Sequence, residues 1–180
     1  MTARPSAPGA VVRDLLQRRL EVPALCRLLS LPQGADVLEL GCGAGNAFAP
    51  LRRHLRPRSL TGVDLATSVG VRADVRSLPF APASFDLVLD FGTCQQAGPE
   101  AVREVVRVLR PGGLFVHETW LAQLLAHPLR PPSGLRWSVV PGLVPARSAL
   151  LWQARTPGYA TGSRKAAGAG AARCSGDQHA

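Results

Sequence analysis

Three alternate glycines and three acidic residues are the part of this sequence whose types and spacing could do chemistry. Gly41, Gly43 and Gly45 stand in the stretch VLELGCGAGNAF, directly after a short apolar run. Glycine removes the side chain where a strand turns sharply into a helix, so that backbone N–H groups can approach a ligand closely. The stretch therefore predicts a ligand-binding loop between a strand and a helix.

The acidic residues indicate what this loop would bind. Glu39 lies two residues before the first glycine, where a carboxylate would repel a pyrophosphate but could hold an ammonium group. Asp64 ends a second apolar run, where an acid can accept hydrogen bonds from both ribose hydroxyls. Asp74, in ADVRSLPF, can accept a hydrogen bond from an adenine amino group. Together they predict a ligand with a cationic amino-acid end, a ribose and an adenine.

Two common nucleotide-binding loops do not fit the stretch. A dinucleotide fingerprint, G-x-G-x-x-G, would need glycine at position 46, and Asn46 stands there. A phosphate-binding loop would need G-K-[ST], which occurs nowhere in the chain.

The elements that must position these residues alternate between strands and helices. Such alternation is typical of an α/β fold with a doubly wound, mostly parallel sheet, whose ligands bind beyond the carboxyl ends of the strands. Apolar runs predict strands over 35–40, 59–65, 85–90, 113–119, 134–140 and 149–155. Helical spacing and punctuation predict two short helices within 11–30, then helices over 46–55, 98–113 and 120–127.

At this point the sequence resembles the class I S-adenosylmethionine-dependent methyltransferases, of the type 11-like kind that acts on small molecules. The resemblance covers about residues 34–119 and rests on VLELGCGAG, TGVDL, ADVRSLPF, SFDLVLD and VVRVLRPGGLFVHE in the family's order. It implies a Rossmann-like, three-layer αβα fold with a closing antiparallel strand. It also implies S-adenosyl-L-methionine as cofactor and methyl transfer to a small-molecule acceptor by in-line displacement.

The resemblance also assigns cofactor contacts to positions of this sequence that match the family's motifs. The loop at the methionine end comprises Gly41, Cys42, Gly43 and Gly45, with Glu39 before it; Asp64 and Leu65 hold the ribose; Asp74 and Val75 hold the adenine edge; and the segment from Asp90 and Phe91 to Thr93 faces the sulfonium methyl. No metal ligand is expected.

One departure from the family's pattern concerns the link between two of these acids. Only nine residues separate Asp64 from Asp74, whereas the family places a helix between its second and third strands. A parallel crossover that includes a helix needs at least about 10 to 12 residues. Either a bare loop makes this connection, or the edge strand is missing.

A second departure concerns the group that would remove a proton from the acceptor. Gln95 and Gln96 stand where similar enzymes often carry histidine, and glutamine cannot abstract a proton. His117 and Glu118 are possible substitutes, but strand alternation turns them to opposite faces. A structural role for His117 and a packing role for Cys94 remain open, so the catalytic residue is not assigned.

Composition sets the remaining expectations. The 180 residues favour one methyltransferase domain over 31–156, preceded by N-terminal helices over 1–30 and followed by a disordered tail over 157–180. No apolar run is long enough to cross a membrane. The four cysteines lie far apart, which favours reduced thiols and a cytoplasmic location.

The charge leaves one alternative partner open. The formal net charge is +9, almost all from arginine spread along the chain, with the densest cluster over 52–58. A nucleic-acid-directed methyltransferase is therefore a competing hypothesis, though a solvated helix end explains that cluster equally well. A third hypothesis is a degenerate methyltransferase-fold protein that binds cofactor without turnover.

Overall fold

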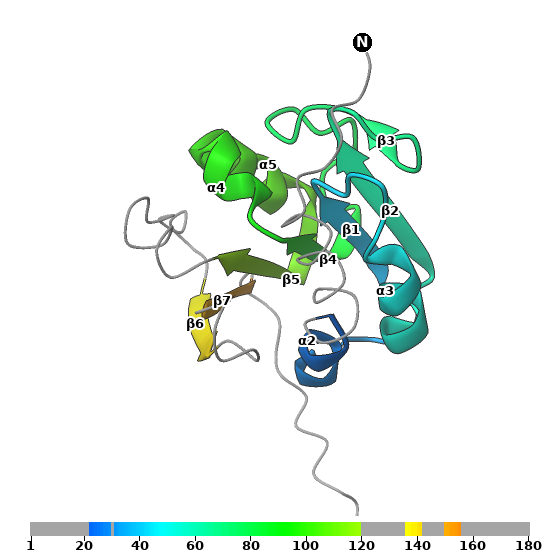
Figure 1. Cartoon of the computed structure of the whole chain (residues 1–180). Helices are drawn as coiled ribbons and strands as arrows, with labels where there is room; N and C mark the ends of the chain where they lie inside the picture. The colour runs from blue at the N-terminus through cyan, green and yellow to red at the C-terminus, as the bar shows by residue number, and fades with distance from the viewer. Residues whose placement is uncertain (1–21, 30, 120–135, 142–149, 156–180) are drawn as a thin grey trace, which may run out of the picture.

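A seven-stranded sheet forms the centre of the protein (Figure 1). The computed structural model describes residues 22–29, 31–119, 136–141 and 150–155. Within these residues the elements are α2 (Val22–Leu28), β1 (Asp36–Leu40), α3 (Phe48–Leu55), β2 (Ser59–Asp64), β3 (Val71–Arg72), β4 (Phe85–Asp90), α4 (Thr93–Ala97), α5 (Pro99–Val108), β5 (Leu109–Thr119), β6 (Arg136–Pro141) and β7 (Leu150–Arg155).

The strand order is β3-β2-β1-β4-β5-β7-β6. The first five strands in this order are parallel, and β7 is antiparallel to both of its neighbours. Because β1 lies between β2 and β4, the chain reverses its winding direction there, which is the switch point where ligands bind in such sheets. The predicted doubly wound sheet with a closing antiparallel strand is confirmed.

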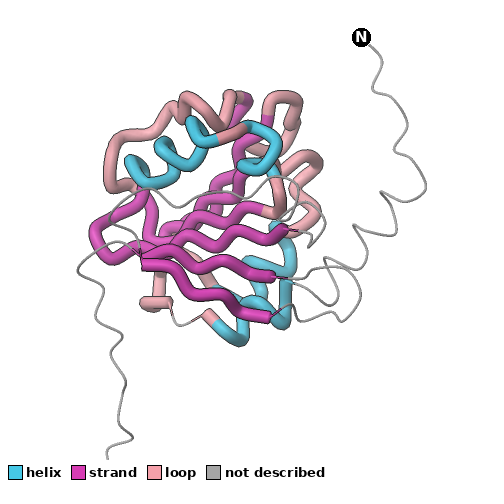
Figure 2. Tube along the Cα trace, turned by 90° about the vertical axis from the view of Figure 1, so that its left-hand side faces the viewer, coloured by secondary structure: helices cyan, strands magenta, loops and turns pink. Residues whose placement is uncertain are grey.

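Helices cover both faces of the sheet and give three layers (Figure 2). On one face Leu38, Val88 and Phe115 pack with α5 and the buried Cys94 of α4. On the other face Val37 and Leu89 pack with residues of α2 and α3. The buried pattern of β1, in which all five residues are inaccessible, reflects this double covering.

Most predicted elements are present, with shifts at their ends. Of the two short helices predicted within 11–30, the second is α2, and Pro23 lies in its first turn, where proline is tolerated because its missing N–H would have no partner. The helix predicted from residue 46 begins at Phe48. The helix predicted to stop at Pro111 already ends at Val108, because Leu109 is extended and begins β5. The helix α4 was not predicted.

Some expectations fall outside the described residues. They are the first of the two N-terminal helices, the helix over 120–127 and the disordered tail over 157–180. Within the part of the chain that the structure describes, no helix has both the length and the apolar composition needed to cross a membrane.

The short link from Asp64 to Asp74 resolves as a bare loop with an edge strand present. Residues 65–70 lead directly from β2 into the two-residue strand β3, which pairs in parallel through Val63 with Val71 and Asp64 with Arg72. No helix lies within residues 65–70. A surface hollow of about 610 Å³ lies beside β2, and its lining residues include Phe48, Leu60 and Val69.

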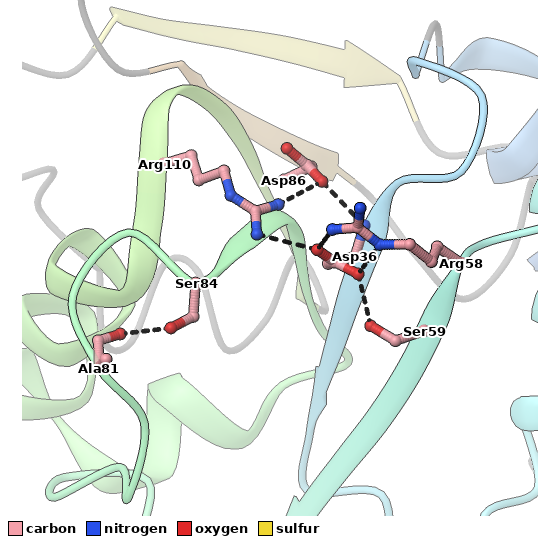
Figure 3. A network of polar contacts seen from close by, with 7 residues as sticks. All are labelled: Asp36, Arg58, Ser59, Ala81, Ser84, Asp86 and Arg110. Carbon is pink, nitrogen blue, oxygen red and sulfur yellow. Dashed lines mark hydrogen bonds and ion pairs between the residues drawn. The ribbon is translucent and has the colours of Figure 1, made fainter.

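An ion-pair network ties the amino ends of the strands together (Figure 3). Asp36 on β1 accepts hydrogen bonds from Arg58, Ser59 and Arg110. Asp86 on β4 accepts a hydrogen bond from the Asp36 backbone N–H at 2.8 Å and an ion pair from Arg110 at 2.6 Å. Asp86 thus anchors the backbone of β1.

The network also sets the protonation of Asp36. Its hydrogen bonds, chiefly from Arg58, hold the pKa of the Asp36 carboxyl well below its usual range. A lowered pKa means that the stabilisation is present above the pKa of the unfolded carboxyl and is lost as the pH falls.

Replacing Arg110 with alanine is expected to lower the free energy of unfolding by about 1 to 2 kcal/mol, because Asp36 and Asp86 each lose a charged donor. Urea denaturation followed by circular dichroism measures this loss. Arg103→Ala is the matched control, because its ion pair with Glu100 is exposed on both sides and should contribute less than about 0.5 kcal/mol. Equal losses in the two variants would contradict the assignment.

Candidate functional site

The glycine loop takes a backbone path that other residues adopt with strain. Gly41, Gly43 and Gly45 have φ angles of 68°, 50° and 73°. The loop stays attached to the sheet, because Gly41 N and Cys42 N both donate to the Val63 carbonyl, at 2.7 and 3.1 Å. These contacts fix the loop at the carboxyl ends of β1 and β2.

Two of the glycines serve different purposes. A Cβ on Gly41 would lie 1.9 Å from Thr93 Oγ1, so the absence of a side chain there allows α4 to approach β1. A Cβ on Gly43 would meet no atom within 4 Å. Gly43 is exposed, and its open surroundings leave room for a ligand against the backbone.

Replacing each glycine with alanine should separate these purposes. Both variants carry the cost of a positive φ, about 1 to 2 kcal/mol. Gly41→Ala should lose about a further 1 kcal/mol or more in the free energy of unfolding because of the contact with Thr93. Thermal unfolding checks the difference, and equal stability of the two variants would contradict it.

The carboxylate of Asp64 sits beside the loop at the end of β2. Its Oδ2 accepts a hydrogen bond from Gly43 N at 3.0 Å, and its Oδ1 accepts one from Ala66 N at 2.9 Å. Each carboxylate oxygen can accept a second hydrogen bond. Asp64 is therefore held in place by the backbone and still has the capacity to bind two hydroxyl groups.

Asp74 and Val75 follow the edge strand and lie on the same side of the sheet as Asp64. Arg76 N donates to Asp74 Oδ1 at 2.8 Å, and the Arg76 guanidinium pairs with Asp74 Oδ2 at 2.6 Å. These hydrogen bonds from Arg76 lower the pKa of Asp74 to about 2, so the group is a carboxylate at neutral pH. Val75 is buried.

A cavity of about 390 Å³ unites several of the predicted residues. Its size lies in the range of small-molecule sites. The lining residues are Gly41, Asp64, Leu65, Asp74, Val75, Arg76, Thr93, Gln96 and Ala97. Two acids face one arginine that is already paired, so the lining favours a cationic or neutral ligand over a phosphate-bearing one.

Other predicted site residues lie around this cavity without lining it. Glu39 is buried in β1, and burial raises its pKa to about 8. Within the described residues, its Oε2 atom is one of two buried side-chain polar atoms without a hydrogen-bond partner. Cys42 is buried under the loop, and Gly45 lines the hollow beside β2 instead. Phe91 is half-buried and packs with the α2 and α3 side of the core.

Asp90 ends β4 and is fully enclosed. Its Oδ1 accepts a hydrogen bond from Thr93 N at 2.6 Å, and Cys94 N donates to both of its oxygens at 3.1 and 3.2 Å. His117 Nδ1 contacts Asp90 Oδ2 at 2.5 Å. Burial raises the pKa of the Cys94 thiol well above its usual value, so the packing role of Cys94 is confirmed.

Sequence reasoning missed two lining residues, Arg76 and Ala97. Arg76 could have been found from its position two residues after Asp74, where an Asx-type turn lets the side chains meet. Ala97 lies at the end of α4, whose single turn carries no apolar periodicity and gave no signal.

The comparisons with known proteins agree with this fold. Residues 38–117 match the family model described as "Methyltransferase domain". They include the glycine loop, Asp64, Asp74 and the Asp90–His117 contact. The sequence resemblance to methyltransferases is therefore confirmed over these residues.

Two curated relatives from mycobacteria share the domain. The chain is 38% identical over 123 residues to a phthiotriol/phenolphthiotriol dimycocerosates methyltransferase of Mycobacterium tuberculosis, covering 54% of this chain and 45% of that protein. It is 37% identical over 101 residues to a fatty-acid O-methyltransferase of Mycolicibacterium smegmatis, covering 47% and 37%. The chain thus spans less than half the length of either relative.

A solved structure shows the same fold. A SAM-dependent methyltransferase from Aquifex aeolicus superposes with a TM-score of 0.62 at 14% identity, covering 83% of this chain and 99% of that one. The likeness concerns the fold alone.

The residues present fit the cofactor that this class uses. S-adenosylmethionine has a ribose and an adenine, and Asp64 and Asp74 line one cavity, in which Asp64 keeps free acceptor capacity. Its amino-acid end carries an ammonium group, and the open surroundings of Gly43 and the unpartnered Glu39 Oε2 lie towards the carboxyl end of β1. The ribose and the ammonium group therefore each have a matching group.

Proposed function

We propose that this protein transfers a methyl group from S-adenosylmethionine to a small-molecule lipid acceptor. The observation that carries the proposal is the cavity in which Asp64 and Asp74 meet the glycine loop. The lipid class is supported by the names of the two mycobacterial relatives. Domain boundaries at 31–156 and a cytoplasmic location belong to the same proposal; the buried, free thiols of Cys26, Cys42 and Cys94 support that location.

The proposed cofactor contacts follow the chemistry of each residue. Asp64 accepts hydrogen bonds from the two ribose hydroxyls, with Leu65 beside it. Asp74 and Val75 hold the adenine edge. The methionine end lies against the backbone of Gly41, Cys42, Gly43 and Gly45. Asp90 and Phe91 are assigned to the methyl end. Asp90 contributes indirectly, because its carboxylate accepts hydrogen bonds from the backbone of the first turn of α4.

Glu39 takes part through its protonation state. Because its pKa is about 8, the group is mostly protonated at neutral pH in the free protein. An ammonium group nearby favours the ionised form of a carboxyl. We therefore assign Glu39 the role of pairing with the ammonium group of the cofactor's amino-acid end.

The chain supplies positioning for the reaction. When bound, the cofactor supplies an activated sulfonium methyl group. The residues around the cavity hold it at a fixed orientation, and positioning of reactants can contribute about 7 to 11 kcal/mol to lowering a barrier. Hydrogen bonds from α4 to Asp90 hold α4 against the end of β4, which helps to keep the residues around the cavity in fixed positions.

Two measurements test the proposal. Isothermal titration calorimetry with S-adenosylhomocysteine should show binding, and absence of heat up to millimolar ligand would refute the cofactor assignment. Transfer of labelled methyl groups from S-adenosylmethionine to a panel of long-chain lipids tests turnover. Binding without transfer to any acceptor would favour a cofactor-binding protein without catalysis. Salt-sensitive transfer to RNA or DNA would favour the nucleic-acid alternative.

A further inference from the structure

A buried acid–histidine pair lies next to the proposed cofactor cavity without lining it. Asp90 and His117 are register partners on the parallel strands β4 and β5. Their side chains are 0% and 2% exposed, and His117 Nδ1 lies 2.5 Å from Asp90 Oδ2. Thr93, whose backbone N–H donates to Asp90, lines the cavity itself. The pair is thus one residue contact away from the site.

The hydrogen bonds around Asp90 indicate which nitrogen of His117 carries the proton. The Thr93 and Cys94 backbone N–H groups both donate to Asp90, and an N–H group can only donate. Because these donors hold Asp90 as a carboxylate, both of its oxygens act as acceptors. In the short contact with Asp90 Oδ2, His117 Nδ1 is therefore the donor and carries the proton. A neutral imidazole with Nδ1–H has a bare lone pair on Nε2.

That lone pair has no partner. In the described part of the chain, His117 Nε2 and Glu39 Oε2 are the two buried side-chain polar atoms that lack one. Buried polar groups in native proteins are normally satisfied, and exceptions often mark a functional role. A carboxylate that orients a histidine, whose other nitrogen awaits a donor, is the arrangement by which enzymes activate a hydroxyl group.

We infer that His117 is the general base that accepts the proton of an acceptor hydroxyl, and that Asp90 is the residue that positions it. The inference rests on the proposed methyl transfer. As the acceptor O–H bond breaks, its proton moves to His117 Nε2, and the oxygen forms a bond to the methyl carbon. The electron pair of the breaking carbon–sulfur bond stays on sulfur, which leaves as S-adenosylhomocysteine. The proton then passes from His117 to water.

The same geometry selects the class of acceptor. A hydroxyl group arrives protonated, so it can donate to the Nε2 lone pair and needs a base. The carboxyl group of a lipid acid is ionised at neutral pH, so it has no proton to donate to His117 Nε2. Its negative charge would also be repelled by the lone pair on that nitrogen. The pair therefore favours a lipid alcohol over a lipid acid as the methyl acceptor.

The test uses the full chain and two probes that differ only at the head group, 2-hexadecanol and hexadecanoic acid, with labelled S-adenosylmethionine. His117→Asn keeps an amide N–H where Nδ1–H stood but removes the base. Asp90→Asn keeps the acceptor for the α4 amides but offers an N–H to Nδ1, which moves the histidine proton to Nε2. His54→Asn, on the exposed last turn of α3, is the control.

The expected result is a kcat for 2-hexadecanol lowered about 100-fold or more in both variants, as loss of a general base implies. In His117→Asn the KM for cofactor and the affinity for S-adenosylhomocysteine should stay within about twofold of the wild type, and His54→Asn should behave as the wild type. Methylation of the acid alone, of neither probe, or of the alcohol at an unchanged rate in His117→Asn would overturn the inference.

A spectroscopic measurement keeps the inference testable without turnover. Long-range ¹H–¹⁵N correlation spectra of the wild type should show His117 as the Nδ1–H tautomer at neutral pH. An Nε2–H tautomer would overturn the inference even if the variants fail to fold. If S-adenosylhomocysteine does not bind the wild type, the proposed function fails; if it binds and the tautomer is wrong, only the base assignment fails.

Discussion

Asp64→Ala is expected to weaken the binding of S-adenosylhomocysteine at least about 100-fold, which corresponds to about 2.7 kcal/mol. The carboxylate is fastened by Gly43 N and Ala66 N, so its free acceptor positions are already oriented before a ligand arrives. Hydrogen bonds to a charged group contribute about 1.5 to 3 kcal/mol each, and the ribose would make two. Isothermal titration calorimetry measures the loss.

The same substitution also removes the acceptor for Gly43 N, so stability must be measured in parallel. Asp64→Asn retains the shape of the side chain and should lose less affinity than Asp64→Ala. Glu100→Ala, on the exposed start of α5, is the control for loss of one negative charge. Unchanged affinity in a folded Asp64→Ala protein would place the ribose elsewhere.

Glu39→Gln is expected to stabilise the protein at alkaline pH. The Glu39 carboxyl is buried, and burial raises its pKa from 4.5 to about 8. Between these values the unfolded chain releases the proton and the folded chain retains it, so the free energy of unfolding falls as the pH rises towards 8. At 1.36 kcal/mol per pKa unit, the gain of the Gln variant at pH 8 should reach about 4 kcal/mol at most.

The pH dependence supplies the internal control for this prediction. Near pH 4 the Glu39 carboxyl is neutral in both folded and unfolded chains, so wild type and Glu39→Gln should differ little. Urea denaturation at intervals from pH 4 to pH 8 should show the difference growing steadily. The exposed Glu100→Gln should show no such trend. A constant difference across this range would mean that Glu39 is ionised in the folded protein.

Elements whose signal is local could be predicted from the sequence. The strand at 85–90 is an apolar run, and α5 has proline at its first position and glutamate in its first turn, so both were found. The glycine loop could be predicted because a sharp turn demands residues that tolerate a positive φ angle. The roles of Asp64 and Asp74 towards a ribose and an adenine stay predictions. Alternation also separated the buried His117 from the half-buried Glu118.

Features that depend on register could not be predicted in this way. The contact between Asp90 and His117 arises because β4 and β5 pair in parallel at that offset, after an irregularity between Phe85 and Leu87. Nothing within either strand's own sequence encodes that offset. The sequence left two alternatives for the segment after Asp64, a bare loop that leads to an edge strand or no edge strand at all. A six-residue link is compatible with both, and the pairing of Val63 with Val71 in the structure shows that the edge strand is present.

The six-residue link 65–70 joins the strand that ends at Asp64 directly to the strand that leads to Asp74, and Ala73 N donates back to the Asp64 carbonyl. Asp64 is anchored independently of that edge strand, because Gly43 N and Ala66 N donate to its carboxylate. A fluctuation that detaches β3 would therefore displace Asp74 and leave Asp64 in place. In the proposed site the purine would then be released before the sugar, so the edge strand would set the order in which the two halves of the nucleoside leave.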